Sequence, residues 1–454
     1  MRATVSNVVR LADIPAGARR EIRSKLTLRN PEFDQRTRAG AETGGTPEIV
    51  TYYTEERSSG AIVVPRGALA VVKAAAARAR VDLAIEDLTL TLPETCFRFV
   101  GDLRLYQLGA AFTALNRWSN VIDAPAAAGK TVIGLWLAAQ RKQPCLVIVP
   151  TKKLLEQWWA RAREFLAIDT PIGIIGDGKV EIGAELTIGI INSVAEIAGK
   201  LSTQFGHLIV DECHRAPGER YFSTISAIHA RYLLGLSATA FRRDGLTPVI
   251  GWLLGPTIKV DRGPLVKAGA ILPAEIEQRP TEFGSDLNAS DHYGSVITEL
   301  IANPERNKRI CADVAHEMET CEDVILLLSD RKGHCGLIIA YMELLGVEVA
   351  RMTGDMSKAQ AEFYQKALEK RTIRVIAATT QFVGEGWDFP RVGVLLLITP
   401  IKFSGKLIQA VGRALRPSPG MDRARIIDYV DNKVPQLLQS ARGRSRTYTK
   451  EISQ

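Results

Sequence analysis

Short apolar runs alternate with helix-length amphipathic segments along most of the chain from Leu103 onward. The runs cover residues 120–124, 145–150, 187–191, 207–210 and 232–236, and the pattern resumes at 324–328, 373–378 and 393–398. Strands that are buried on both faces of a parallel sheet read as continuous apolar runs, because helices cover both faces. The pattern therefore predicts an α/β fold with two tandem lobes, each a parallel sheet with helices on both faces.

Residues 1–92 lack this alternation. They carry short strand-like runs, an Ala-rich segment at 67–80 that is typical of a helix, and turn signals at Gly40, Gly44, Gly45 and Gly60. We expect a small, separate α+β N-terminal accessory domain there, without a catalytic constellation. The first lobe then covers 93–260, the second covers 303–435, and 436–454 is a basic tail. The linker and hinge between the lobes is expected at 261–302, which contains Gly263, Pro264, Gly269, Pro273 and Pro280.

Composition agrees with a multidomain globular protein. The chain has 454 residues, of which 46% are hydrophobic and 24% charged, enough for two or three ordinary domains. The longest apolar run, 392–400, is far shorter than the ~20 residues that a membrane helix needs, and the first residues lack a signal-peptide core. We therefore expect no membrane partner and a cytoplasmic location. The six cysteines show neither C-x-x-C pairs nor zinc-type spacing, which favours reduced, buried thiols.

The net charge of +8 favours a polyanionic partner. Residues 1–40 hold nine basic and four acidic side chains, and 9 − 4 gives +5. This excess makes the N-terminal domain a candidate DNA-binding domain. The tail adds Arg442, Arg444, Arg446 and Lys450 against Glu451, and it fits a phosphate-binding strip or a solvated end equally well.

The sequence APAAAGKT at 124–131 follows the first apolar run of the first lobe. A strand, a turn of small residues and a helix start present backbone N–H groups to phosphate, and the helix dipole adds to the attraction. We expect Lys130 to reach the β and γ phosphates of ATP and Thr131 to bind Mg²⁺. Ala127 stands where such a turn needs a positive φ, which predicts local strain. Taken alone, the segment also fits a chance turn. The residues predicted to contact the nucleotide are Ala124, Pro125, Ala126, Ala127, Ala128, Gly129, Lys130 and Thr131.

The sequence DECH at 211–214 follows the apolar residues 208–210 and marks the carboxyl end of a central strand. There Asp211 would hold Mg²⁺ and Glu212 would take a proton from the attacking water. A surface acidic pair is disfavoured directly after three apolar residues. The adjacent Cys-His pair cannot form a tetrahedral metal cage, so we expect His214 to couple the nucleotide to Ser237 and Thr239.

The second lobe carries a candidate arginine pair. QAVGRALR at 409–416 predicts a helix that Ser404 caps and Pro417 ends. Its candidate catalytic residues are Gln409, Arg413 and Arg416. The arginines share one helix face and could neutralise charge on the γ-phosphoryl group; the alternative is a solvated pair near a helix C-terminus. Upstream, after the strand at 373–378, a Gly-rich crossing can approach a phosphate or ribose, and its candidate residues are Gly386 and Asp388.

These blocks, in this order, resemble those of superfamily 2 helicases over about 100–430. LRLYQ (103–107) resembles the adenine-reading motif and implies that Gln107 hydrogen-bonds to adenine. Further blocks are VPTKKLLEQWW (149–159), IGIINSV (188–194), LLSDRKGHC (327–335) and MTGDMSKAQ (352–360). SATAFRRDG (237–245), LVKAGAILPAEI (265–276) and NPERNKRI (303–310) resemble the xeroderma-pigmentosum-group-B and phage repair helicase branch. FRRD departs from the Arg-acid-Asp element of that branch, because Arg243 replaces the acid.

The resemblance implies two tandem RecA-like P-loop domains that use ATP and Mg²⁺ to move along or unwind DNA, in repair, recombination, or phage and mobile-element metabolism. The DNA would be single-stranded, duplex or forked, and partner proteins of a repair, phage or defence system are expected. Sequence-tolerant backbone contacts would come from Thr151, Lys152, Asn192, Ser193, Ser329, Thr379 and Thr380. Three alternatives remain: an RNA helicase on the same scaffold, a nucleotide-gated clamp with little hydrolysis, and the motor subunit of a restriction or defence assembly.

Overall fold

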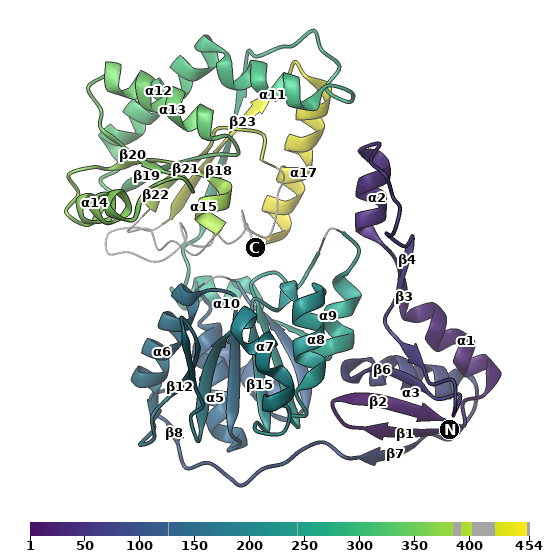
Figure 1. The fold of residues 1–454 in the computed structure, drawn as a ribbon. Helices are drawn as coiled ribbons and strands as arrows, with labels where there is room; N and C mark the ends of the chain where they lie inside the picture. Colours follow the sequence, from purple (N-terminus) through teal and green to yellow (C-terminus); the bar gives the residue numbers. More distant parts are fainter. Residues whose placement is uncertain (126, 243, 385–391, 402–422, 452–454) are drawn as a thin grey trace. The chain divides into compact units, whose positions relative to one another are not determined.

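The computed structural model describes residues 1–454 apart from 126, 243, 385–391, 402–422 and 452–454. The chain divides into two compact units, Met1–Ala124 with Gly129–Val260, and Pro125–Ala128 with Asp261–Gln454. Each unit contains one large, mainly parallel sheet with helices around it (Figure 1). The prediction of two α/β lobes is therefore confirmed. Within the described residues, every helix is too short or too polar to span a bilayer.

The N-terminal domain folds around a five-stranded sheet of order β5-β6-β2-β1-β7. Strand β2 alternates as a half-buried strand does, with Val9 and Leu11 buried and Arg10 exposed. Helices α1 and α3 pack against each other, and β3, α2 and β4 form an arm that projects from the sheet (Figure 1). The bounds are β1 (Arg2–Val5), β2 (Val8–Ala12), α1 (Ala16–Lys25), β3 (Thr27–Arg29), α2 (Pro31–Arg38), β4 (Ile49–Thr51), β5 (Thr54–Glu55), β6 (Ile62–Pro65), η1 (Arg66–Ala68), α3 (Leu69–Arg78) and β7 (Ala84–Asp87).

The first lobe is built on an eight-stranded sheet of order β13-β12-β14-β10-β15-β16-β9-β17. Its strands run parallel except β13, which forms an antiparallel hairpin with β12. The five apolar runs predicted in this lobe are confirmed as β9, β10, β14, β15 and β16. The bounds are β9 (Ser119–Asp123), β10 (Cys145–Val149), β12 (Gly173–Gly176), β13 (Lys179–Glu181), β14 (Leu186–Ile190), β15 (His207–Asp211), β16 (Tyr232–Ser237) and β17 (Thr257–Lys259).

The helices of the first lobe alternate with these strands. They are α4 (Leu105–Leu115), α5 (Lys130–Arg141), α6 (Lys152–Phe165), α7 (Ile191–Leu201), η2 (Cys213–Arg215), α8 (Glu219–Ala227) and α9 (Thr247–Leu254). A separate two-stranded pair joins β8 (Arg98–Phe99) to β11 (Leu166–Ala167). Because parallel strands end at one edge of the sheet, β9, β15 and β16 bring their last residues together. Asp123 pairs in register with Ser237, and Asp211 with Leu236.

The N-terminal domain and the first lobe share one hydrophobic core. A single cluster of buried side chains includes Leu11 and Val72 of the domain and Leu233 and Leu254 of the lobe. The rings of Tyr52 and Trp252 lie 5.4 Å apart across this junction. The sequence predicts a separate unit over 1–92, and the structure gives this segment its own sheet but not its own core.

Two residues of the sequence VPRG at 64–67 anchor this junction. Arg66 is buried, and its guanidinium donates to the carbonyl oxygens of Ala230 and Arg231, the latter at 2.9 Å. Gly67 lies so close to α9 that an added Cβ would stand 2.3 Å from the carbonyl oxygen of Gly251. A side chain at position 67 is therefore incompatible with this packing.

The second lobe has a six-stranded, all-parallel sheet of order β18-β23-β22-β19-β21-β20. The three apolar runs predicted here are confirmed as β19, β21 and β22. The strands are β18 (Ala274–Thr281), β19 (Val324–Ser329), β20 (Val349–Met352), β21 (Val375–Thr379), β22 (Val392–Leu397) and β23 (Ala424–Asp431). The helices are α10 (Arg262–Lys267), α11 (Tyr293–Ala302), α12 (Pro304–Thr320), α13 (Lys332–Leu344), α14 (Lys358–Glu369), α15 (Thr380–Gly384) and α17 (Pro435–Glu451).

The segment predicted as a linker over 261–302 contributes to this sheet. Ala274–Thr281 form β18, which pairs with β23 over its whole length. This strand is hard to recognise in the sequence, because it contains alternating charged residues and Pro280. An edge strand tolerates both, because one of its sides forms no ladder.

The predicted basic tail is largely helical. In α17, Ala441, Arg444 and Tyr448 are buried, which is the spacing of one helix face. The Arg444 side chain is 2% exposed, and its guanidinium pairs with the Asp428 carboxylate of β23 at 2.9 Å. The Tyr448 hydroxyl donates to the same carboxylate at 3.1 Å. Arg444 therefore belongs neither to a phosphate-binding strip nor to a solvated end, because its charge is neutralised inside the lobe.

Candidate active site

The loop after β9 has the backbone of a phosphate-binding turn. Ala127 has a φ of 66° and Gly129 a φ of 74°, and α5 begins directly afterwards with Lys130 and Thr131. The strain predicted at Ala127 is confirmed, because a residue with a Cβ rarely occupies this left-handed region. The amide of Ala124 donates to the Ser237 carbonyl oxygen at 3.0 Å, which ties the loop to β16.

Lys130 is half-buried at the start of α5 and lies near three carboxylates. Its ammonium group donates to the Ala124 carbonyl oxygen at 3.0 Å. Burial lowers the pKa of Lys130, and the charges of Glu212, Asp211 and Asp123 oppose that shift. A cation held among acids at the mouth of such a loop suits a ligand that brings its own negative charge.

Asp211 and Glu212 stand at the carboxyl end of β15. The Asp211 carboxylate accepts from the indole N–H of Trp158 at 2.8 Å and from the Glu212 amide at 2.9 Å. Burial raises the pKa of Asp211 and the charge of Glu212 adds to the rise, while Trp158 and Lys130 oppose it. Burial also opposes ionisation of Glu212. The hydrogen bond from His214 and the charge of Lys130 outweigh this effect and lower the pKa of Glu212.

His214 connects this acidic pair to the end of β16. Its Nδ1 lies 3.2 Å from the Glu212 carboxylate and 3.3 Å from the Ser237 hydroxyl. The Ser237 hydroxyl oxygen in turn accepts from the Thr239 amide at 3.0 Å. The three residues predicted to couple the nucleotide to the rest of the lobe thus lie in a continuous series of polar contacts from Glu212, with Nδ1 of His214 shared between Glu212 and Ser237.

Three contacts at this site are not anticipated from the sequence. Asp123 accepts from the Ala240 amide at 3.2 Å, so it supports both the loop and the segment after β16. Arg242 donates to the His214 carbonyl oxygen at 2.9 Å and pairs with Asp244. Trp158 holds Asp211, as described above. In the sequence, these contacts are indicated only by the position of Asp123 next to the loop and by the Trp-Trp pair in EQWW.

Gln107 packs against the same loop. Its carbonyl oxygen accepts from the Arg104 amide at 2.8 Å, and its side chain is 4% exposed. A Cβ built on Gly129 would stand 2.4 Å from its amide nitrogen. The glycine therefore permits the side chain to lie beside the phosphate loop.

Oxygen ligands at this edge suit Mg²⁺. The Asp211 carboxylate is held in one orientation by its hydrogen bonds. Thr131 is the second residue of α5 and directly follows the loop. Among the described residues no group of three or more His, Cys, Asp and Glu side chains could hold a metal. Mg²⁺ commonly keeps several waters and takes only one or two protein ligands beside phosphate oxygens. The donor set therefore fits a magnesium–nucleotide complex.

Two family models match the chain on its two lobes. The type III restriction enzyme res subunit matches residues 101–242, and the helicase conserved C-terminal domain matches 306–418. The DNA 3′–5′ translocase XPB2 of Sulfurisphaera tokodaii is 33% identical over 38% of this chain and 39% of its own length. The chain is a superfamily 2 helicase. It is related to the XPB and phage branch of that superfamily, whose members hydrolyse ATP.

Other relatives cover more of the helicase. A protein of Escherichia phage T5, provisionally named a helicase, is 26% identical over 72% of this chain and 71% of its own length. A mimivirus protein, provisionally named an ATP-dependent RNA helicase, is 26% identical over 71% of this chain and 62% of its own length. The Pyrococcus furiosus Hef helicase domain aligns with a TM-score of 0.53 at 13% identity, over 76% of this chain and 98% of that one. This likeness supports the fold of tandem RecA-like domains.

Two predicted strand contacts of the helicase lie at the start of α6. Thr151 caps the helix, and its hydroxyl oxygen accepts from the Leu154 amide at 3.4 Å. The Lys152 ammonium lies 2.5 Å from the carboxylate of Asp177, in the turn between β12 and β13. This hydrogen bond raises the pKa of Lys152. The cation is exposed but already has an anionic neighbour.

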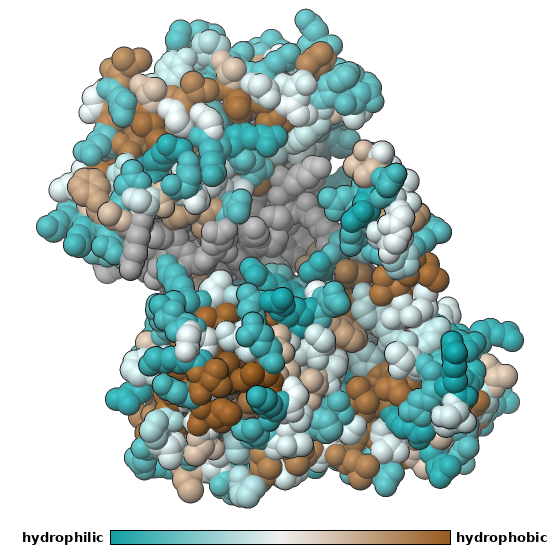
Figure 2. Space-filling view, in the orientation of Figure 1, coloured by the Kyte–Doolittle hydropathy of each residue, from teal (hydrophilic) through white to brown (hydrophobic). Residues whose placement is uncertain are grey.

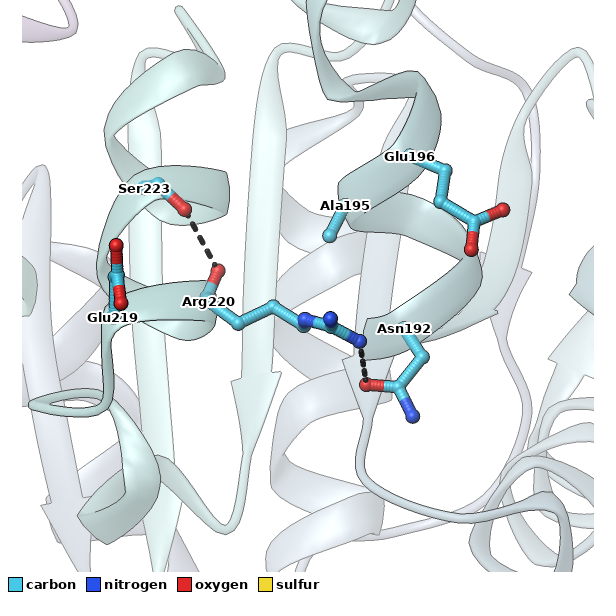
Figure 3. A pocket seen from close by; sticks show the side chains of 6 residues that line it. All are labelled: Asn192, Ala195, Glu196, Glu219, Arg220 and Ser223. Atoms are coloured by element: carbon cyan, nitrogen blue, oxygen red, sulfur yellow. Dashed lines mark hydrogen bonds between the residues drawn. The ribbon is translucent and has the colours of Figure 1, made fainter.

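Two further predicted contacts lie at the start of α7. Asn192 accepts from the Arg220 guanidinium of α8 at 2.9 Å, and Ser193 is half-buried beside it. A shallow pocket of about 420 Å³ lies between the two helices (Figure 3). Its lining residues are Asn192, Ala195, Glu196, Glu219, Arg220 and Ser223. Arg220 adds a positive charge beside Asn192.

The three predicted strand contacts in the second lobe differ in burial. Ser329 and Thr379 pair in register at the ends of β19 and β21, and both are buried. The Ser329 hydroxyl lies 3.2 Å from Nδ1 of His334 and accepts from the Arg331 amide at 3.1 Å. Ser329 is therefore hydrogen-bonded within the lobe, and the strand contacts of both residues stay a prediction. Thr380 is half-buried and donates to Asp330.

The remaining predicted site residues lie outside the described residues. They are Ala126 of the loop, Gly386 and Asp388 of the Gly-rich crossing, and Gln409, Arg413 and Arg416 of the arginine helix. Arg243 of the FRRD sequence also lies outside them.

Proposed function

We propose that this helicase couples ATP hydrolysis to movement along or unwinding of DNA, in repair, recombination, or phage and mobile-element metabolism. One observation carries the proposal. A half-buried lysine at a phosphate loop lies near Asp211 and Glu212, and Nδ1 of His214 contacts both the Glu212 carboxylate and the Ser237 hydroxyl. This arrangement can bind a nucleotide. The contacts of His214 and Ser237 connect the nucleotide site to the segment after β16.

The chemistry of the proposed site follows from its charges. Lys130 and the amides at the start of α5 bind the β and γ phosphates, and Thr131 and Asp211 hold Mg²⁺. Bound Mg²⁺ would neutralise charge on the phosphate oxygens. Glu212 has a lowered pKa and is therefore ionised near neutral pH, so it can accept a proton from the attacking water. His214 orients that carboxylate. Gln107 would read the adenine, and Gln409, Arg413 and Arg416, with Gly386 and Asp388, remain predicted contributors from the second lobe.

DNA is the proposed partner because the XPB2 relative is named a DNA translocase. Contacts through Thr151, Lys152, Asn192, Ser193 and Thr380 would grip a backbone without reading bases. RNA is the second candidate substrate, because the mimivirus relative is named an RNA helicase. Partner proteins of a repair, phage or defence assembly, and a cytoplasmic location, belong to the same proposal.

ATP turnover measured with single-stranded, duplex and forked DNA, and with RNA, tests this function. We expect turnover to rise several-fold with DNA and less with RNA of equal length. Stronger stimulation by RNA would contradict the DNA assignment. Tight ATP binding without turnover on any polynucleotide would favour a nucleotide-gated clamp, for which the strained Ala127 is the motivating observation.

A further inference from the structure

The indole of Trp158 links three elements of the nucleotide site. It lies on α6, its side chain is 1% exposed, and its N–H donates to the Asp211 carboxylate of β15 at 2.8 Å. On α5, a Cβ built on Gly134 would stand 2.9 Å from the indole ring. The ring therefore occupies the space that the missing side chain of Gly134 leaves beside the phosphate-loop helix.

The two hydrogen bonds orient the Asp211 carboxylate and leave an acceptor site on each of its oxygens. One oxygen accepts from Trp158 and the other from the Glu212 amide. Each carboxylate oxygen has a second acceptor site, which is available to a metal ion or a metal-bound water. The indole N–H does not titrate in the physiological range, so it donates at every pH at which the enzyme is folded. A rotation of the carboxylate would break this hydrogen bond.

Helix α6 also begins at a proposed strand contact. Thr151 caps it, and Trp158 follows seven positions later, two turns along the same face. An α-helix of this length is stiff, and the side chain of Trp158 is locked by packing. A displacement at Thr151 and Lys152 would therefore move the indole that holds the carboxylate.

We infer that Trp158 is a positioning residue, which fixes the Asp211 carboxylate for Mg²⁺ and ties it to the strand-binding end of α6. This inference rests on the proposed function. Groups that orient a metal ligand from behind typically change metal affinity about 10–100-fold when they are removed. The adjacent Trp159 provides a matched control, because it is 40% exposed and the Arg163 guanidinium lies over its ring at 5.6 Å.

Mn²⁺ binding, measured by electron paramagnetic resonance with a non-hydrolysable ATP analogue, tests the inference without relying on turnover. Trp158→Phe keeps an aromatic ring and removes the N–H. We expect Trp158→Phe to weaken Mn²⁺ binding about ten-fold. Trp159→Phe should keep the Mn²⁺ affinity within about two-fold of that of the parent protein. Equal affinities in parent and Trp158→Phe would overturn the inference. Failure of the parent itself to bind Mn²⁺ and the analogue would instead contradict the proposed function.

A second measurement covers the case in which Trp158→Phe does not fold. The chain has six tryptophans, so the unsubstituted protein labelled with ¹⁵N gives six indole N–H signals. One of them should shift on addition of Mg²⁺ with the analogue, and the same signal should shift in Asp211→Asn. If Mg²⁺ and the analogue leave the signal that Asp211→Asn shifts unmoved, the inference is wrong.

Discussion

Single side chains that could bind a nucleic-acid backbone are already engaged in this structure. Lys152 pairs with Asp177, and Asn192 accepts from Arg220. Asp177 has a φ of 55° in the turn between β12 and β13, so a local turn brings this carboxylate to the start of α6. A phosphate that approaches Lys152 therefore competes with Asp177, which should weaken binding of a strand.

Replacement of Asp177 by Asn should tighten DNA binding a few-fold, because it removes the competing charge and keeps the shape of the turn. Lys152→Ala should weaken binding and lower the salt dependence by roughly one phosphate contact. Fluorescence anisotropy with single-stranded DNA over a range of salt concentrations measures both. In the Lys152→Ala background, Asp177→Asn should have little effect. Weaker binding by the single Asp177→Asn variant would show that the pair does not compete with phosphate.

Elements of the first unit are held together by close approach as well as by hydrophobic burial. Gly67→Ala should destabilise the unit by about 1–3 kcal/mol, since the new methyl group would overlap the backbone of α9. Gly17→Ala is the matched control, because it lies in helix α1 of the same domain with nothing within 4 Å of its added Cβ. We expect this control to be neutral or slightly stabilising. Thermal unfolding midpoints compare the two, and equal midpoints would contradict the docking role of Gly67.

In the second lobe, α17 is fixed to β23 by a buried ion pair. Arg444→Ala leaves the Asp428 carboxylate buried without its cationic partner and should cost about 3–5 kcal/mol. Arg442→Ala, two residues away and exposed, should change stability by less than about 0.5 kcal/mol. Urea denaturation of both variants checks this difference. A similarly small effect of both substitutions would return Arg444 to the solvated-tail interpretation.

The sequence predicts those elements whose signal is local. Continuous apolar runs identify the central strands, and the loop at 124–131 is recognisable because its backbone chemistry lies within eight consecutive residues. Strand β18 is missed because an edge position tolerates charge and proline. Trp158 and Asp177 are missed for another reason: their partners lie 53 and 25 residues away, by 211 − 158 and 177 − 152. Nothing in the sequence distinguishes the buried Trp158 from its exposed neighbour.

For the whole molecule, the positive charge at the N-terminus is largely paired. Six of the nine basic residues in 1–40 form ion pairs with acids of the same domain: Arg2, Arg10, Arg19, Arg23, Arg29 and Arg36. Three of these acids, Glu48, Glu55 and Glu56, lie beyond residue 40. Hydrophilic residues gather over α1 on the visible face (Figure 2). Arg19 and Arg23 of this helix pair with Glu55. This pairing weakens the electrostatic argument for a DNA-binding N-terminal domain, and that role stays a prediction.

The shared core gives the N-terminal domain a structural role in the motor. Removal of residues 1–92 would expose the surface of Trp252 that Tyr52 contacts and would take away part of the cluster that the domain shares with the lobe. Truncation would therefore change folding and DNA affinity together, so point substitutions are the better probes of this domain.

The central claim is that the first lobe binds ATP with Lys130 and hydrolyses it with Glu212. Glu212→Gln tests it most directly, because the amide keeps the size of the side chain and cannot accept the proton. With single-stranded DNA present, this variant should bind ATP with nearly unchanged affinity and lose turnover by about 10²–10⁴-fold, whereas Lys130→Ala should lose binding itself. Turnover by Glu212→Gln within a few-fold of the parent would contradict the account.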